Sequence, residues 1–128
     1  MEKEKYLTEM QPLLSERVVK STDNIDIVVK FSRYGNEHLY SDTLGRAKGV
    51  LLKKDLKNLK TALEHSEFVK SVAVTEQRKD GVTKFYYFKD NALDLYYNVG
   101  ERAFKGKKGK IRYFRFLYSA TRNLKSGE

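Results

Sequence analysis

The polar segment 33–42 carries the densest group of side chains that could do chemistry. It reads Arg-Tyr-Gly-Asn-Glu-His-Leu-Tyr-Ser-Asp and lies between a predicted strand and a predicted helix, where loops commonly present functional groups. His38 is one of two histidines, and imidazole is suited to proton transfer near neutral pH. We expect His38 to be a catalytic acid or base, a structural histidine being the alternative, and Arg33 to contact nucleic acid. His65, at a predicted helix end, fits a structural role.

A glycine-flanked basic motif follows at residues 44–49, which read Leu-Gly-Arg-Ala-Lys-Gly. Glycines let a backbone approach a phosphate, and arginine offers a bidentate fork for it. The motif lacks the Gly-Lys-Ser/Thr ending of a P-loop. We expect Arg46 to act on the phosphate in catalysis and Lys48 to bind nucleic acid, although a flexible loop explains the spacing nearly as well.

Basic and aromatic residues alternate through the last predicted strand, 111–121. Single-stranded nucleic acid is often held by stacking on rings together with neutralisation of phosphates. The residues that we expect to bind it here are Arg112, Arg115, Tyr118 and Arg122. Strand alternation would place Ser119 and Thr121 on one face with Arg115, so both hydroxyls are candidate catalytic groups. Most of the aromatic residues could equally form core.

The charge of the chain favours an anionic partner. There are 26 Lys and Arg against 17 Asp and Glu, a formal net charge of +9. Residues 102–125 contain nine of these bases and no acid. Such a surplus fits RNA, DNA or an acidic protein, although Lys105, Lys107 and Lys108 could simply solvate a loop. We expect no membrane association, since no apolar run is long enough to cross a bilayer.

Several chemical classes have little or no support. Because the chain has no Cys, it can have no disulfide, thiolate zinc site or cysteine nucleophile. No His-rich spacing predicts a metal site, and no Gly-x-Ser-x-Gly elbow predicts a serine hydrolase. We expect neither a metal nor a cofactor.

The elements that must position these groups follow from periodicity. Residues 1–22 are predicted to be helical, with Thr8 and Gln11 as a capping box. A strand at 25–31, a polar loop with a short helix near 37–40, and a leucine-striped helix at 52–63 come next. Four strands are then predicted at 68–75, 82–88, 93–99 and 111–121, with an Asp-Gly turn at 80–81. The expected fold is one α+β domain, residues 1–128, with helices on one face of a four-stranded antiparallel meander.

This order of elements resembles the barnase–EndoU–colicin E5/D–RelE group of ribonucleases over about residues 25–125. The resemblance rests on an early loop His38, a helix, and an antiparallel sheet ending in Ser119, Thr121 and Arg122. Domains of this group occur in phage-associated proteins and in bacterial toxins. The resemblance implies metal-independent RNA cleavage, with His38 as acid or base and the hydroxyls of the last strand beside it. Arg46 and Lys48 have no counterpart in it and rest on local chemistry alone.

The function predicted on these grounds is cleavage of RNA, tRNA included, by transesterification through the ribose 2′-oxygen. Arg46 and Arg115 would contact the phosphate, and Ser119 or Thr121 would orient it. The expected partners are RNA and an acidic immunity or antitoxin protein, and the expected location is the cytoplasm, either of its own cell or of a target cell. Two alternatives stay open: a non-catalytic RNA- or DNA-binding module that uses the last strand, and a protein-interaction domain.

Overall fold

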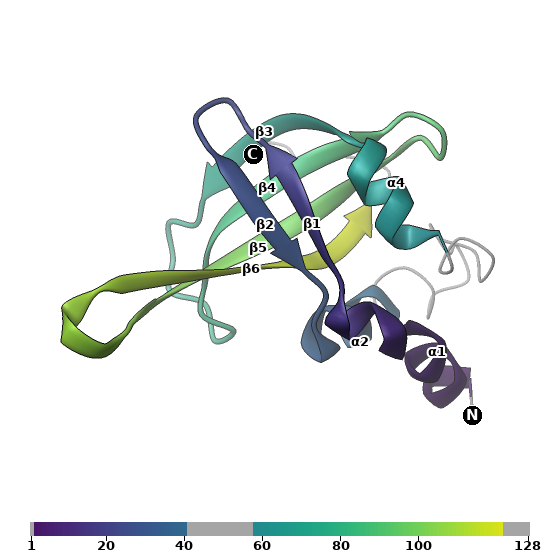
Figure 1. The fold of residues 1–128 in the computed structure, drawn as a ribbon, viewed down its shortest axis with the longest axis horizontal. Coiled ribbons are helices and arrows are strands. Elements are labelled where there is room, and N and C mark those ends of the chain that lie inside the picture. The colour runs from purple at the N-terminus through teal and green to yellow at the C-terminus, as the bar shows by residue number, and fades with distance from the viewer. Residues whose placement is uncertain (1, 41–57, 122–128) are drawn as a thin grey trace.

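The part of the chain that the structure describes folds as a curled six-stranded sheet with three short α-helices (Figure 1). The computed structural model describes residues 2–40 and 58–121. The helices are α1 (Glu2–Met10), α2 (Arg33–Leu39) and α4 (Leu59–His65), with 3₁₀ turns η1 (Gln11–Ser15) and η3 (Lys107–Gly109). The strands are β1 (Arg17–Ser21), β2 (Asp26–Lys30), β3 (Glu67–Ala73), β4 (Val82–Asp90), β5 (Leu95–Lys105) and β6 (Ile111–Thr121).

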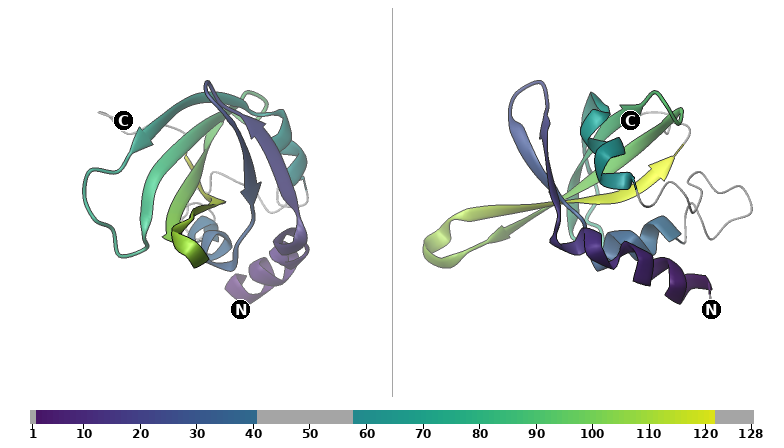
Figure 2. Two further views of the ribbon diagram at one scale, coloured as in Figure 1. Left: turned by 60° about the vertical axis from the view of Figure 1, so that its left-hand side comes forward. Right: turned by 45° about the vertical axis from the view of Figure 1, so that its right-hand side comes forward.

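The predicted architecture, a four-stranded meander with helices on one face, is wrong. The strand order is β1-β2-β6-β5-β4-β3, so the sheet has six strands. The four C-terminal strands are antiparallel neighbours in chain order, but β2 adds to β6 in parallel and β1 pairs with β2. The strands curl around the interior instead of lying as a flat layer (Figure 2).

The strand that was missed, β1, lies where a helix was predicted. Helix α1 ends at Met10, Pro12 begins a 3₁₀ turn, and the chain is extended from Arg17. Burial alternates along β1, and Val18 pairs with Val29 of β2. The adjacent β-branched residues favour a strand, and tertiary pairing outweighs the weak helical spacing. Nor does Thr8 cap a helix: its hydroxyl donates to the Glu4 carbonyl inside α1.

Most of the core lies on one face of the sheet. Its helical members are Tyr6 and Met10 of α1, Leu39 of α2, and Leu59 and Leu63 of α4. The strand residues that meet them include Val18, Ile27, Val29, Phe88, Leu95, Tyr97, Val99, Leu117 and Ala120. The ammonium of Lys20 points inward as well and donates to the Glu64 and Ser66 carbonyls, which fixes the C-terminal end of α4 against β1.

Helix α2 packs against both faces of the sheet, which is why the prediction of helices on one face is wrong. Strand β2 meets β6 at the single pair Lys30–Phe116, and α2 then follows β2 and packs along β6. The contact is close because Gly35 has no side chain: a Cβ there would lie 2.1 Å from the Leu117 carbonyl oxygen. Leu39 enters the main core, whereas the Tyr34 ring packs edge-on against Phe116 on the opposite face.

Replacing Gly35 by alanine is therefore expected to destabilise the protein, although the same change stabilises an open helix by about 1 kcal/mol. Displacing α2 from the backbone of β6 should lower the free energy of unfolding by about 1–3 kcal/mol. Urea denaturation followed by circular dichroism measures the change. Glu37→Ala on the same helix is the control and should shift it by less than about 0.5 kcal/mol. A Gly35→Ala protein as stable as the parent would contradict this packing.

Strands β5 and β6 extend well beyond the rest of the sheet as a projecting hairpin (Figures 1 and 2). The hairpin reaches its tip at η3, where Lys108 and Gly109 have positive φ angles. The strands predicted at 93–99 and 111–121 leave its outer part outside the sheet, but the ladder continues to the pair Lys105–Ile111. Within residues 2–40 and 58–121, no helix has the length and apolar character needed to cross a membrane.

Candidate nucleic-acid interface

Aromatic rings and guanidinium groups alternate along one face of the projecting hairpin, the face opposite the main core. Phe114 and Phe116 stack with their centroids 5.3 Å apart, and Phe116 lies 5.9 Å from Tyr118. The Arg102 guanidinium carbon sits 4.9 Å above the Phe116 ring. We call this surface the aromatic–arginine face; its members are Arg78, Arg102, Phe104, Arg112, Phe114, Phe116 and Tyr118.

Toward the hairpin tip the aromatic–arginine face opens to solvent. Phe104 lies across from Arg112 in the β5–β6 ladder, and its side chain is 51% exposed. Arg112 is exposed too. Beyond them, Lys105, Lys107, Lys108 and Lys110 surround the turn, and none of them is buried. The tip is thus a cationic element with an accessible ring, and its positive charge attracts a polyanion over a distance.

At the other end of the aromatic–arginine face, helix α2 places His38 against strand β6. The His38 and Tyr118 ring centroids are 4.0 Å apart, and the Tyr34 ring lies 6.0 Å from Tyr118. His38 is half-buried in this position. Two residues that sequence reasoning selected separately, 80 positions apart in the chain, therefore meet at one place.

The loop between β3 and β4 adds two groups that sequence reasoning missed. Arg78 forms a bidentate pair with Asp80, with Nε–Oδ1 3.1 Å and Nη2–Oδ2 3.0 Å, and its Nη2 donates to the Tyr118 hydroxyl at 2.9 Å. The Tyr118 hydroxyl in turn donates to Asp80 Oδ2 at 3.0 Å. The Asp80-Gly81 dipeptide was interpreted only as a turn, which it also is, since Gly81 has φ +77°. No local signal shows that its carboxylate reaches β6.

This network shifts the titration of its members. Burial by itself would raise the pKa of the Asp80 carboxyl, but hydrogen bonds from Arg78, the Val82 amide and Tyr118 lower that pKa well below its ordinary value. Burial raises the pKa of the Tyr118 phenol far above 10, and its bonds to Tyr34 and Asp80 add to the rise. Tyr118 therefore keeps its proton at neutral pH and acts as a hydrogen-bond donor.

The depressed Asp80 pKa predicts a loss of stability in acid. A carboxyl whose pKa is lower folded than unfolded stabilises the fold above the unfolded value of about 3.9, and this contribution fades as pH falls below it. Asp80→Asn should therefore lower the melting temperature clearly at pH 6 and by less at pH 2.5, where part of the contribution is already lost. Asp94→Asn is the control, because the Asp94 side chain is 83% exposed. If Asp80→Asn lowered the melting temperature equally at both pH values, the prediction would be contradicted.

The expected grouping of Ser119 and Thr121 with Arg115 does not occur, because β6 is bulged. Asn98 pairs with Ser119, but Val99 pairs with Leu117, so Tyr118 is an extra residue. The bulge reverses the alternation: Leu117 and Ala120 both enter the main core. Ser119 and Thr121 therefore face away from the core, on the side of the sheet opposite Arg115. Ser119 is buried there.

Arg115 lies on the core side of the hairpin and is engaged there. Its Nε donates to Glu101 Oε1 at 2.8 Å, and the Tyr86 hydroxyl donates to the same oxygen at 2.7 Å. Burial, together with this bond, raises the pKa of Tyr86 to about 12. Arg115 thus braces the base of the hairpin, and a contact with nucleic acid stays a prediction for it.

The remaining predicted site residues do not join this cluster or are not described. The Arg33 side chain is 81% exposed and pairs loosely with Glu37 at 3.8 Å. Arg46, Lys48 and Arg122 lie outside the described residues. Among residues 2–40 and 58–121, no three His, Asp or Glu side chains gather as a metal site would require.

Comparison of the chain with protein-family models, with curated proteins and with solved structures finds no match to any of them.

Proposed function

We propose that the chain is an RNA-cleaving domain that holds single-stranded RNA on the aromatic–arginine face and cleaves it beside His38. The observation that carries the proposal is the meeting of His38 and Tyr118, at 4.0 Å between ring centroids, at one end of this face. An acid–base group thus lies where a bound strand would end its path along the rings.

Binding would come from stacking and charge. Bases stack on rings whatever their sequence, and arginines on the same face neutralise phosphates and add cation–π attraction. The exposed Phe104 and Arg112 would make first contact, and the lysines of the tip would raise the rate of encounter. Because phosphate contacts release counterions, affinity should fall steeply with salt.

Cleavage would proceed by transesterification. A base removes the 2′-hydroxyl proton, the 2′-oxygen forms a bond to phosphorus, the bond from phosphorus to the 5′-oxygen breaks, and an acid protonates that leaving oxygen. His38 would perform one of the two proton transfers. The guanidinium groups of Arg78 and Arg102 lie over the neighbouring rings, where they can offset the charge that develops on the phosphorane.

A second function, nucleic-acid binding without cleavage, is favoured by one specific observation. The Tyr118 hydroxyl and the Arg78 guanidinium are both tied to Asp80, so their polar capacity is partly used within the protein. Such a network is equally suited to holding the rings rigidly for stacking.

One assay separates the two functions. Purified protein is incubated with total RNA, and separately with tRNA, in excess EDTA. Cleavage products support the enzyme, whereas binding that weakens with salt and leaves the RNA intact supports the binding module. No affinity at low salt would overturn both. The basic hairpin would then be assigned to an acidic protein partner of the immunity or antitoxin kind.

A further inference from the structure

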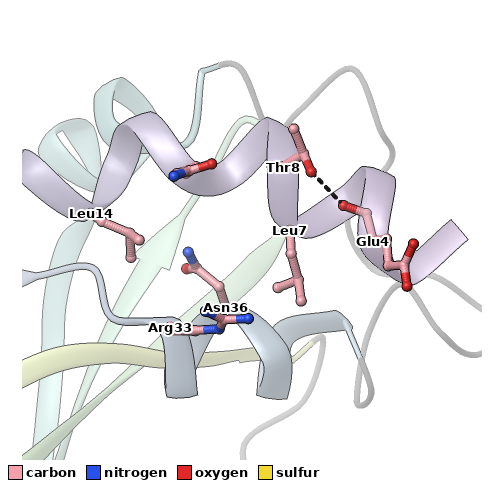
Figure 3. Close-up of a pocket in the computed structure, with 7 residues that line it drawn as sticks. Glu4, Leu7, Thr8, Leu14, Arg33 and Asn36 are labelled. Atoms are coloured by element: carbon pink, nitrogen blue, oxygen red, sulfur yellow. Dashed lines mark hydrogen bonds between the residues drawn. The ribbon is translucent and has the colours of Figure 1, made fainter. Parts of the chain in front are cut away.

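A separate cavity lies between α1–η1 and α2, away from the aromatic–arginine face. It has a volume of about 240 Å³, and its walls include Leu7, Leu14, Arg33 and Asn36 (Figure 3). This is smaller than the sites of about 300–1,000 Å³ that hold drug-sized molecules. A single ring system is therefore the size of ligand that fits.

Asn36 is the residue of this cavity that has an unsatisfied polar atom. Its side chain rises from α2 toward α1 between Leu7 and Leu14 (Figure 3). The residue is only 2% exposed, yet its carboxamide oxygen Oδ1 has no hydrogen-bond partner. Buried polar atoms are nearly always satisfied, so a buried acceptor without a partner beside a cavity is where the donor of a bound ligand would be stabilised.

The surroundings of Asn36 define the ligand further. Leu7 and Leu14 offer apolar contact, and Leu14 is 42% exposed at the opening. Arg33 at the rim extends its charge into solvent. The rest of the wall is supplied by Glu4, Thr8 and Gln11. The site therefore suits a flat ring that carries N–H donors and is joined to an anionic group on the Arg33 side.

We propose that this α1–α2 pocket holds one nucleobase bearing an exocyclic amino group, with the amine donating to Asn36 Oδ1 and the attached phosphate near Arg33. An asparagine carboxamide is the usual protein partner of adenine, whose amino group it accepts. The proposal rests on the proposed function, because the base would belong to an RNA strand bound to this chain. Asn36 and His38 lie two positions apart on α2 and so leave different sides of the helix, which means that a strand bound at both would pass around α2.

The test uses free mononucleotides on the full chain. Adenosine 5′-monophosphate and uridine 5′-monophosphate are titrated while the side-chain amide of Asn36 is followed by NMR. We expect the adenine nucleotide to bind at least tenfold more tightly than the uracil nucleotide, which lacks the amino group. Equal affinity for the two would overturn the amino-group recognition, and no binding of either would overturn the pocket.

A pocket-filling variant tests the location. Leu14→Trp should fill the cavity from its opening and weaken adenine-nucleotide binding at least tenfold. Val69→Trp, at a position of the same exposure on β3, is the matched control and should leave it unchanged. Unchanged binding in Leu14→Trp would overturn the proposal.

Measuring mononucleotide binding, RNA binding and RNA cleavage on the same protein distinguishes this proposal from the proposed function. If RNA is bound and cleaved but no mononucleotide binds, the proposal for the pocket is wrong and the RNA-cleaving function is not affected. If a mononucleotide binds but RNA does not, the RNA-cleaving function is ruled out, and the α1–α2 pocket is then a site for a free nucleotide.

Discussion

Replacing His38 by alanine is expected to lower the rate of RNA cleavage by about 10²–10⁴-fold, the usual contribution of a general acid or base. The imidazole lies at the end of the aromatic–arginine face, and its side-chain type is the one best suited to proton transfer near neutral pH. The rate is measured with RNA in excess over protein and in the presence of EDTA, so that a contaminating metal-dependent nuclease does not contribute.

His65→Ala is the matched control for this prediction. His65 ends α4, away from the aromatic–arginine face, and its loss should leave the cleavage rate unchanged. Because His38 packs on Tyr118, His38→Gln should accompany the alanine variant: it keeps side-chain bulk and loses the titrating group. Full activity in both His38 variants would remove the residue from the mechanism, and an equal loss in His65→Ala would indicate a general effect on stability.

Replacing Phe104 by alanine is expected to weaken the binding of single-stranded RNA by about 5- to 150-fold, since stacking of one base contributes about 1–3 kcal/mol. The ring is 51% exposed and stands at the open end of the aromatic–arginine face, so its removal should cost little stability. Fluorescence anisotropy with a labelled oligonucleotide, at one fixed salt concentration, measures the affinity.

Ile111→Ala provides the control on the same hairpin. Ile111 is 62% exposed, but strand alternation puts it on the other face, and its removal should change the affinity less than about twofold. Equal losses in the two variants would mean that the hairpin binds through its charge alone. A parental affinity in Phe104→Ala would place the RNA elsewhere.

These two predictions address different steps and can fail independently. Phe104 lies near the tip of the hairpin and His38 on α2, with Phe114, Phe116 and Tyr118 between them along the face. Loss of affinity with Phe104→Ala and loss of rate with His38→Ala would show that a strand runs the length of the face. Loss of affinity in a protein that never cleaves RNA would favour the binding module.

Strand positions could be predicted where alternation or turn chemistry is strong. The segments predicted at 25–31, 68–75, 82–88 and 111–121 correspond to β2, β3, β4 and β6, with ends shifted by up to two residues. Strand β5 runs on to Lys105 because cross-strand pairing overrides glycine and lysine, which are poor strand formers. Strand β1 was missed because its two valines fit a helical stripe as well as a ladder, and only β2 beside it decides between them.

The candidate site shows the same division. His38 and Tyr118 could be selected by residue type, since an imidazole and a ring among arginines carry their chemistry wherever they lie. Asp80 could not, because its carboxylate is set apart from other turn aspartates only by reaching Tyr118 across 38 positions of chain. The bulge at Tyr118 is invisible to a period-2 pattern, and it is what turns Ser119 away from Arg115.

By itself, the sequence determined the charge of the hairpin, the alternation of rings and bases along β6, and the presence of an imidazole at position 38. Composition and local spacing carry these properties, and they do not depend on what the chain folds against. Only the tertiary structure decided that α2 packs on β6 through Gly35, that His38 therefore meets Tyr118, and that Asn36 faces a cavity instead of a partner. Each of these depends on contacts between distant segments, whose geometry is set by close packing and steric exclusion.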